Sequence, residues 1–249
     1  DFHRQVIWEE GENALSVHQY YKDQSHGTLN IVSADYDGSA GSPFGLITIS
    51  LDASCYNGGK HPDRLLSSNG NTEEALLIRH ANEVAMLTSV VKKISEDLKV
   101  DFTKFDTNSD DRIDQSELCL YLVVAGYEEA FGGYIDSKHP AVWAHAWSSF
   151  SSETVPSASH DLKISGKTIT DWAMNGECGY DKTSPKKPII LPFRGTMTHE
   201  LGHQMCKLPD LYDVSGGNNG LDMYSLMGAG NWGALSGDIP GSRPVNLHA

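Results

Sequence analysis

One stretch constrains the fold of this chain more than any other: residues 198–213 read THELGHQMCKLPDLYD. His199 and His203 are four residues apart, so on a helix both imidazoles lie on one face, about one turn apart. Glu200 lies beside them. The pattern H-E-x-x-H on a helix is typical of two zinc ligands with a general base next to them. The sequence therefore predicts a metal-binding helix, and the alternative is a solvent-exposed helix with two unrelated histidines.

A catalytic zinc ion normally has three protein ligands and one open position for water. No glutamate occurs after Glu200, so a later glutamate is excluded as the third ligand. Pro209 cannot continue a helix, so the chain must turn soon after His203, and such a turn can bring Asp210 to the ion. Asp213 is the alternative ligand; otherwise it caps a loop or binds calcium. Glu200 is the expected general base toward a metal-activated water, which is the chemistry of amide hydrolysis.

Residues 106–117 read DTNSDDRIDQSE and have the ligand spacing of a 12-residue calcium loop. The departure is Asp111, where such a loop normally has Gly for a sharp turn, although Asp tolerates left-handed geometry better than most residues. The residues that follow, LCLYLVVA, do not predict a second helix. The sequence thus favours a structural calcium site within an enzyme, and the alternative is an acidic turn before a strand. The expected ligands are Asp106, Asn108, Asp110, the backbone carbonyl of Arg112, Asp114 and Glu117.

The composition excludes several classes of partner. The formal net charge is −14, from 33 acidic against 19 basic residues, and there is no basic block. Nucleic acid and anionic membrane surfaces are therefore not expected partners. No apolar run approaches the roughly 20 residues that a transmembrane helix needs. The chain opens on DFHR without a cationic, apolar leader, as expected of a mature form.

The four cysteines, Cys55, Cys119, Cys178 and Cys206, are widely separated and form no C-x-x-C. This argues against a structural zinc ribbon or a dithiol redox site. Cys119 lies in an apolar run and is expected to be a buried thiol. If the protein is exported, at least one disulfide is expected.

The hydrophobic pattern predicts a single α/β (α+β) domain over residues 1–249 with a partly parallel sheet. Apolar residues recur at three- and four-residue spacing over about residues 72–99, which predicts a long helix with His80 off its apolar stripe and at the surface. Leu118 to Ala125 is a continuous apolar run that predicts a strand buried on both faces. Further strands are expected at residues 29–33, at residues 45–51 and in short pieces over residues 148–192.

Taken together, these segments resemble the immune inhibitor A family of secreted zinc metallopeptidases. The resemblance implies a metzincin-like catalytic domain with a mixed twisted sheet, a long backing helix and an active-site helix. It also implies a methionine-bearing turn beneath the zinc, a role that Met227 would fill, and it supports Asp210 as the third ligand. The matching stretches keep the family's order over most of the chain: SVHQYYKDQSHGTLN (16–30), VDFTKFDTNSDDRID (100–114), VVAGYEEA (123–130), AVWAHAW (141–147), THELGHQMCKLPDLYD (198–213) and YSLMGAGNW (224–232).

Two departures from the family pattern affect these expectations. The family usually has Gly three residues after the second histidine and Asp three residues further on. Here Cys206 takes the place of Gly, and Asp210 follows His203 by seven residues, so the turn must be built differently and Asp213 stays an alternative. The usual domain also begins with an extra strand and continues past residues 246–249, so this chain is expected to be shortened at both ends.

The sequence therefore predicts a secreted, extracellular zinc endopeptidase that acts on proteins or peptides and is stabilised by Ca²⁺. Zn²⁺ would lie on His199, His203 and Asp210. Possible cleft residues are Tyr212, Tyr224 and His145. Of these, His145 could stabilise an oxyanion, and the alternative is that it is a core residue. The alternatives are a calcium-dependent extracellular binding or adhesion module with a structural zinc, and a narrower exopeptidase. Substrate preference and oligomeric state stay open.

Overall fold

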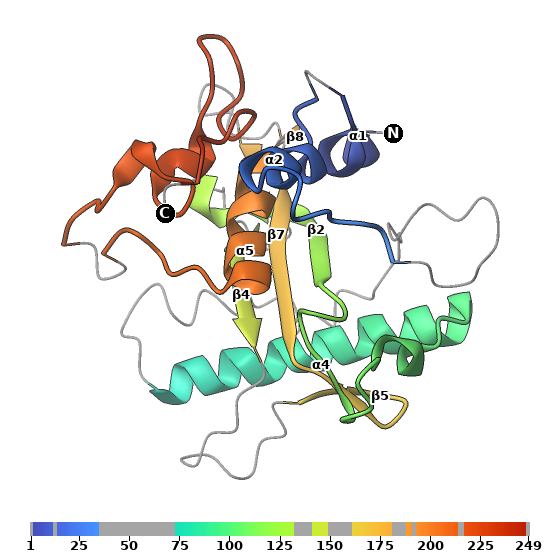
Figure 1. Ribbon diagram of the computed structural model, residues 1–249. Coiled ribbons are helices and arrows are strands. Elements are labelled where there is room, and N and C mark those ends of the chain that lie inside the picture. Colours follow the sequence, from blue (N-terminus) through green and yellow to red (C-terminus); the bar gives the residue numbers. More distant parts are fainter. Residues whose placement is uncertain are drawn as a thin grey trace.

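The computed structural model describes residues 2–11, 14–34, 73–131, 141–148, 161–180, 188–190, 193–213 and 217–247. They form a mixed α/β fold, which confirms the predicted fold class (Figure 1). The helices are α1 (Phe2–Trp8), α2 (Val17–Gln24), α4 (Glu73–Leu98) and α5 (Arg194–Cys206), with short 3₁₀ helices η2 (Phe102–Phe105), η3 (Glu129–Phe131), η4 (Asp222–Tyr224) and η5 (Ala229–Trp232). The strands are β1 (Arg112–Ile113), β2 (Leu120–Glu128), β3 (Ala141–Val142), β4 (His145–Ser148), β5 (Leu162–Ile164), β6 (Lys167–Ile169), β7 (Asp171–Tyr180) and β8 (Pro188–Ile190).

The main sheet has the strand order β3-β2-β7-β4, and β8 also pairs with β7. Strand β2 is parallel to both β3 and β7, whereas β4 and β8 are antiparallel to β7, so the sheet is mixed. The register between β2 and β7 shifts between Val124 and Tyr127. The strand expected over residues 118–125 is present as Leu120–Glu128, but most of its residues are only partly buried, so the expected burial on both faces is wrong. Strand β7 is ten residues long, where only short pieces were expected.

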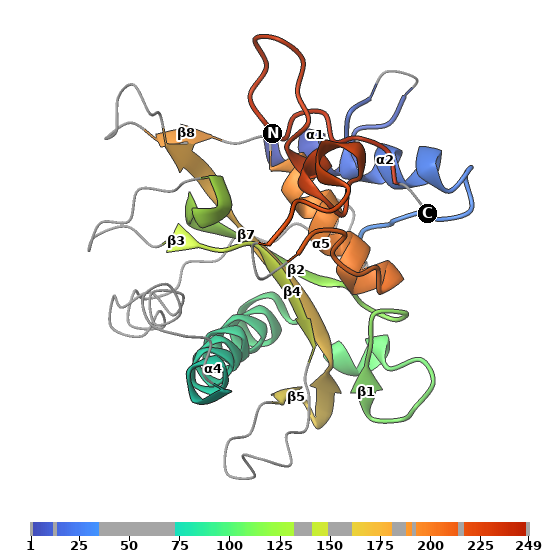
Figure 2. The same ribbon diagram turned by 90° about the vertical axis from the view of Figure 1, so that its left-hand side faces the viewer.

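Helices cover both faces of this sheet (Figure 2). On one face α4 buries Leu87 and Val91 against Trp172 and Met174 of β7. On the other face α1, α2 and α5 form a second core, to which Tyr21 contributes. Alternate residues of one strand point to opposite faces, so β2 contributes side chains to both cores. Among the described residues, no helix is both long enough and apolar enough to cross a membrane.

Two expectations about local structure are wrong. His80 is 1% exposed and packs between Trp147 and Trp172, with ring centroids 5.3 and 5.4 Å away. The surface of α4 on which His80 lies faces the aromatic rings of β4 and β7, so this polar position is inside the core. Residues 29–33 form no strand, although the turn before them is made by Gly27 with φ of 79°. The strand expected at residues 45–51 lies outside the described residues.

A smaller sheet, with the order β1-β6-β5, packs below α4 and joins the predicted calcium loop to a hairpin. Strands β5 and β6 are antiparallel and are linked by Ser165 and Gly166, whose φ angles of 51° and 81° suit a tight hairpin turn. Strand β1 runs parallel to β6, with Ile113 opposite Ile169. Both isoleucines are fully buried, so the loop is anchored to the core at this point.

A buried carboxylate closes the end of β2. Glu128 is 1% exposed, and its oxygens accept hydrogen bonds from the backbone N–H groups of Ala130 (3.0 Å), Ala144 (3.2 Å) and Gly176 (2.9 Å). A Cβ on Gly176 would lie 2.5 Å from the backbone nitrogen of Glu128, so only glycine fits there. This side chain therefore joins β2, β7 and the segment that leads into β4.

Burial raises the pKa of Glu128 to about 8, against the effect of the three N–H donors. Because the folded-state pKa lies above the unfolded value of 4.5, the protonated Glu128 side chain favours the folded state. This contribution to stability is fully present below pH 4.5 and is lost as the pH rises to about 8. We expect the free energy of unfolding to fall by up to about 4 kcal/mol over this interval. Urea unfolding at pH 5, 6.5 and 8 checks this. Glu128→Gln should make the free energy of unfolding less dependent on pH. The same pH dependence in both proteins would contradict this prediction.

Candidate metal centre

Neighbouring segments pack closely against helix α5 at two of its glycines, where no side chain keeps them apart. A Cβ on Gly195 would lie 1.8 Å from the carbonyl oxygen of Asn231, and one on Gly202 would lie 2.9 Å from the sulfur of Met227. From α2, the Tyr21 hydroxyl donates a 2.5 Å hydrogen bond to the carbonyl of Thr198. The helix that was expected to bind metal is thus held in place by α2 and by the C-terminal segment.

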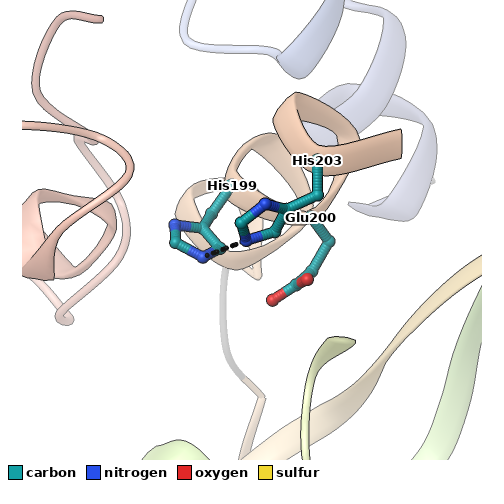
Figure 3. Close-up of side chains that lie close together, drawn as sticks. All are labelled: His199, Glu200 and His203. Atoms are coloured by element: carbon teal, nitrogen blue, oxygen red, sulfur yellow. Dashed lines mark hydrogen bonds between the residues drawn. The ribbon is translucent and has the colours of Figure 1, made fainter. Parts of the chain in front are cut away.

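The two histidines of α5 point their Nε2 atoms at one place (Figure 3). His199 Nδ1 lies 2.8 Å from the carbonyl oxygen of Leu226, and His203 Nδ1 lies 2.6 Å from that of Leu208. A carbonyl oxygen can only accept, so both Nδ1 atoms carry hydrogen, and in the neutral imidazoles both Nε2 atoms present lone pairs. The two Nε2 atoms are 3.1 Å apart. Such a contact between lone pairs is repulsive unless a cation or a proton lies between them.

Asp210 completes this group. Its Oδ1 lies 3.2 Å from His199 Nε2 and 3.1 Å from His203 Nε2. Burial opposes the charge of the Asp210 carboxylate, but its contacts with His199 and His203 lower its pKa below the usual range. Three donor atoms thus form a triangle with sides of 3.1 to 3.2 Å. A tetrahedral ion bound at about 2.0–2.1 Å separates its ligands by about 3.3 Å, so the triangle fits zinc.

The turn that brings Asp210 to the histidines accommodates the extra residue of this chain. Lys207 adopts the left-handed conformation (φ 54°, ψ 30°) that glycine usually supplies at a helix end. The N–H groups of Lys207 and Leu208 bond to the carbonyls of His203 and Gly202, and the Lys207 ammonium lies 2.5 Å from Asp171 of β7. This ion pair ties the end of the helix to the sheet.

Asp213, the alternative ligand, lies in a different setting. Its Oδ2 accepts a 3.0 Å hydrogen bond from the N–H of Gly217, and its own N–H bonds to the carbonyl of Asn218. These contacts are those of a loop cap. The structure therefore groups Asp210, and not Asp213, with the two histidines.

Glu200 is 5% exposed and lies beside this group, with one carboxylate oxygen within 4.8 Å of a ring nitrogen of each histidine (Figure 3). Burial raises its pKa above the ordinary value, while His199, His203 and His145 oppose this rise. A carboxylate with a raised pKa next to a metal site is suited to accept a proton and return it.

The turn that contains Met227 packs directly beneath α5. Met227 is 1% exposed, and its carbonyl accepts a 2.8 Å hydrogen bond from the N–H of Leu211. The neighbouring Leu226 supplies the carbonyl that orients His199. This turn therefore orients one histidine and braces the chain just after Asp210. The two backbone carbonyls could not be predicted, because no side-chain pattern marks them.

The three possible cleft residues differ in their surroundings. Tyr212 is 38% exposed, and burial and the interaction with Asp210 raise its pKa. Tyr224 is 77% exposed, so it lies outside any enclosed site that the described residues form. His145 has both ring nitrogens engaged, by Trp143 and by Glu83.

The predicted calcium loop adopts the expected turn. Asp111 is left-handed, with φ of 64°, at the position where such loops usually have glycine. Asp106 accepts bonds from the N–H groups of Asp110 and Asp111, but it also bonds the Lys167 ammonium at 2.7 Å. Glu117 Oε1 accepts the N–H groups of Thr107 and Asn108. Among the described residues, a compact group of three ligating side chains forms at the histidines of α5 and not in this loop.

The three cysteines within the described residues, Cys119, Cys178 and Cys206, are free thiols. Cys119 was expected to be buried but is only partly so. This burial raises the pKa of its thiol to about 11, so the thiol is protonated at neutral pH. The expected disulfide is not found among these three, and Cys55 lies outside the described part of the chain.

Comparisons with known proteins agree with this geometry. The chain matches the family described as immune inhibitor A peptidase M6, catalytic domain, over residues 3–249. It is 24% identical over 243 residues to the pre-pro-metalloprotease PrtV of two Vibrio cholerae serotype O1 strains, M66-2 and ATCC 39315 / El Tor Inaba N16961. The match covers 94% of this chain and 23% of each relative, so the chain spans about a quarter of their length.

No solved structure matches the chain. The family match nevertheless extends over almost every residue and includes the whole histidine helix and the turn after it. The chain therefore belongs to the immune inhibitor A family of M6 peptidases and is a metallopeptidase catalytic domain.

Proposed function

We propose that this domain is a zinc endopeptidase with His199, His203 and Asp210 as the zinc ligands. The observation that carries the proposal is the triangle of two Nε2 atoms and one Oδ1 atom, 3.1 to 3.2 Å apart, with both Nδ1 atoms bonded to backbone carbonyls. Three protein ligands suit a catalytic site, because a structural zinc site is normally closed by four. Bound zinc would lower the pKa of a water molecule and polarise the scissile carbonyl.

Glu200 is the general base and acid in this proposal. Its carboxylate takes a proton from the attacking water and passes it to the nitrogen of the leaving amine. The enclosed position of Glu200 keeps bulk water from competing for this proton. Met227 lies beneath the site as a packing residue, because its sulfur contacts the helix at Gly202.

Cleavage of internal peptide bonds separates an endopeptidase from an exopeptidase. A quenched peptide blocked at both termini, with the fluorophore and quencher flanking an internal segment, is expected to be cleaved. Cleavage of free-ended peptides alone would support the exopeptidase alternative. Zinc uptake without any hydrolysis would support a binding module with a structural zinc.

We also propose export. The relatives are pre-pro-metalloproteases by name, which denotes a precursor with segments that are removed. A net charge of −14 suits an extracellular, calcium-binding protein. Detection of the processed protein in culture medium, with a cytosolic marker absent, tests this.

Calcium binding by residues 106–117 is the second part of the proposal. The ligand spacing and the left-handed Asp111 support it. The contact between Lys167 and Asp106 opposes it, so calcium entry requires the ammonium to move away. The expected role is structural, because Ile113 of this loop anchors β1 in the core.

Calcium should therefore stabilise the zinc-loaded domain. At free calcium about 100 times the Kd, binding adds about 2.7 kcal/mol, which raises Tm by roughly 5–10 °C for a domain of this size. Differential scanning calorimetry with and without calcium measures this. Glu117→Gln should abolish the response, whereas Asp161→Asn, the same loss of charge at an exposed site outside the loop, should keep it. An unchanged Tm in the unsubstituted domain would rule out the site.

A further inference from the structure

A lysine of the β5–β6 hairpin contacts the predicted calcium loop directly. Lys167 is the first residue of β6, and its Nζ lies 2.7 Å from Asp106 Oδ2 and 2.6 Å from Asp111 Oδ1. The hairpin pairs with β1 of the loop (Figure 2), and the N–H of Thr168 donates to the carbonyl of Asp111 at 3.0 Å. Strand pairing therefore places the ammonium at these two carboxylates.

The two carboxylates have different positions in the loop. Asp106 takes the first position, which supplies a calcium ligand, whereas Asp111 takes the sixth, where glycine is usual and no side chain binds calcium. The Asp106 side chain is 1% exposed, and a carboxylate so deeply buried needs a compensating charge. The Asp111 side chain is 78% exposed. The ammonium thus contacts one group that calcium requires and one that calcium does not use.

The strand pairing that places this lysine leaves another calcium ligand available. The carbonyls of Asp111 and Ile113 accept the N–H groups of Thr168 and Thr170, both at 3.0 Å. Carbonyls alternate in direction along a strand, so that of Arg112, which lies between them, points away from β6. Contact with the hairpin and coordination by the Arg112 carbonyl are therefore compatible.

We propose that Lys167 is a resident cation of this loop, whose ammonium neutralises Asp106 in the calcium-free domain and competes with calcium for it. Asp111 keeps the ammonium when calcium takes Asp106, which gives this residue a role at a position where glycine is usual. The inference rests on the proposed function, because it presupposes calcium binding by residues 106–117. Removal of the ammonium should therefore strengthen calcium binding and destabilise the calcium-free domain.

Isothermal titration of the zinc-loaded domain with calcium chloride measures the first effect. Lys167→Gln should bind calcium about tenfold more tightly, because calcium no longer displaces a charged hydrogen bond. Lys167→Arg keeps the positive charge and should not tighten binding. The matched control is Lys163→Gln, which removes a lysine from the other strand of the same hairpin, where it is 63% exposed and pairs with Asp161. Its calcium affinity should be unchanged.

Differential scanning calorimetry measures the second effect, which has the opposite sign. Without calcium, Tm of Lys167→Gln should lie roughly 3–8 °C below that of the unsubstituted domain, because Asp106 loses its compensating charge. At saturating calcium the two Tm values should converge, because calcium then neutralises Asp106 in both proteins. A lysine that only stabilised the hairpin would cost the same Tm under both conditions, and that result would overturn the proposal.

A double-mutant cycle tests the role of Asp111. Asp111→Asn removes the charge but keeps a residue that tolerates the left-handed φ of 64°. It should weaken calcium binding more in the unsubstituted domain than in Lys167→Gln, where there is no ammonium for Asp111 to keep. Equal effects in the two backgrounds would show that Asp111 and Lys167 act independently, which would contradict this role.

The titrations also separate this inference from the calcium site itself. Equal calcium affinity of Lys167→Gln and the unsubstituted domain would overturn the inference and leave the site in place. Absence of binding in both proteins would refute the site, and the inference with it. Binding by Lys167→Gln alone would support the competing ammonium and show that it excludes calcium from the natural chain. If Lys167→Gln is unfolded without calcium, refolding on calcium addition supports the proposal, and failure to refold overturns it.

Discussion

Replacing Glu200 by Gln is expected to lower kcat for internal peptide cleavage by about 10²–10⁴-fold, the range for loss of a general acid–base group. The amide has nearly the shape of the carboxylate but cannot take a proton from water. The zinc ligands in our proposal are two imidazoles and one aspartate, so the variant should bind zinc as tightly as the unsubstituted domain does.

The measurement pairs peptide cleavage with zinc content on the same preparation. Loss of activity with zinc bound supports Glu200 as the base. Undiminished proteolysis with zinc bound would show that another group accepts the proton. Loss of zinc together with activity would show that Glu200 belongs to the ligand set, which would contradict the assigned role.

Asp210→Ala is expected to weaken zinc binding by roughly 100-fold or more, because it removes one of three ligands and leaves two imidazole lone pairs facing each other. Activity should disappear at limiting zinc. Because zinc binds the folded state, Tm at fixed zinc should fall as well. Competition with a chromophoric chelator measures the affinity directly.

Asp213→Ala is the matched control. It removes the same side chain three residues later, at a carboxylate that caps Gly217. Its zinc affinity should stay within about twofold of the unsubstituted value, although the loop cap is lost and stability should fall by about 1 kcal/mol. The reverse pattern, with zinc lost in Asp213→Ala and kept in Asp210→Ala, would make Asp213 the third ligand.

The parts of the fold that could be predicted are those with a strong local pattern. The long helix α4 follows from its apolar periodicity, and the helix of His199 and His203 follows from its motif. Strand β7 was missed as one element, because D-W-A-M-N-G-E-C-G-Y does not alternate cleanly between apolar and polar residues. It becomes a long strand because it is central, with partners on both sides.

The parts of the site that could not be predicted depend on tertiary contacts. His80 was expected at the surface, yet two tryptophans from other elements bury it. Glu83 and His145 are 62 residues apart in the chain, and nothing in either segment indicates the other. The grouping of Asp210 with the histidines was predicted from Pro209 and the length of the turn, and it is what the structure contains.

The two carbonyls that hold His199 and His203 have a consequence for how this centre can change. In many zinc sites a carboxylate side chain has this task, and a single substitution there tunes metal affinity. Here both partners are backbone carbonyl oxygens, those of Leu226 and Leu208, and every amino acid has such an oxygen. Point substitutions at Leu208 or Leu226 leave those acceptors in place, so retuning the metal requires a change in the path of the backbone.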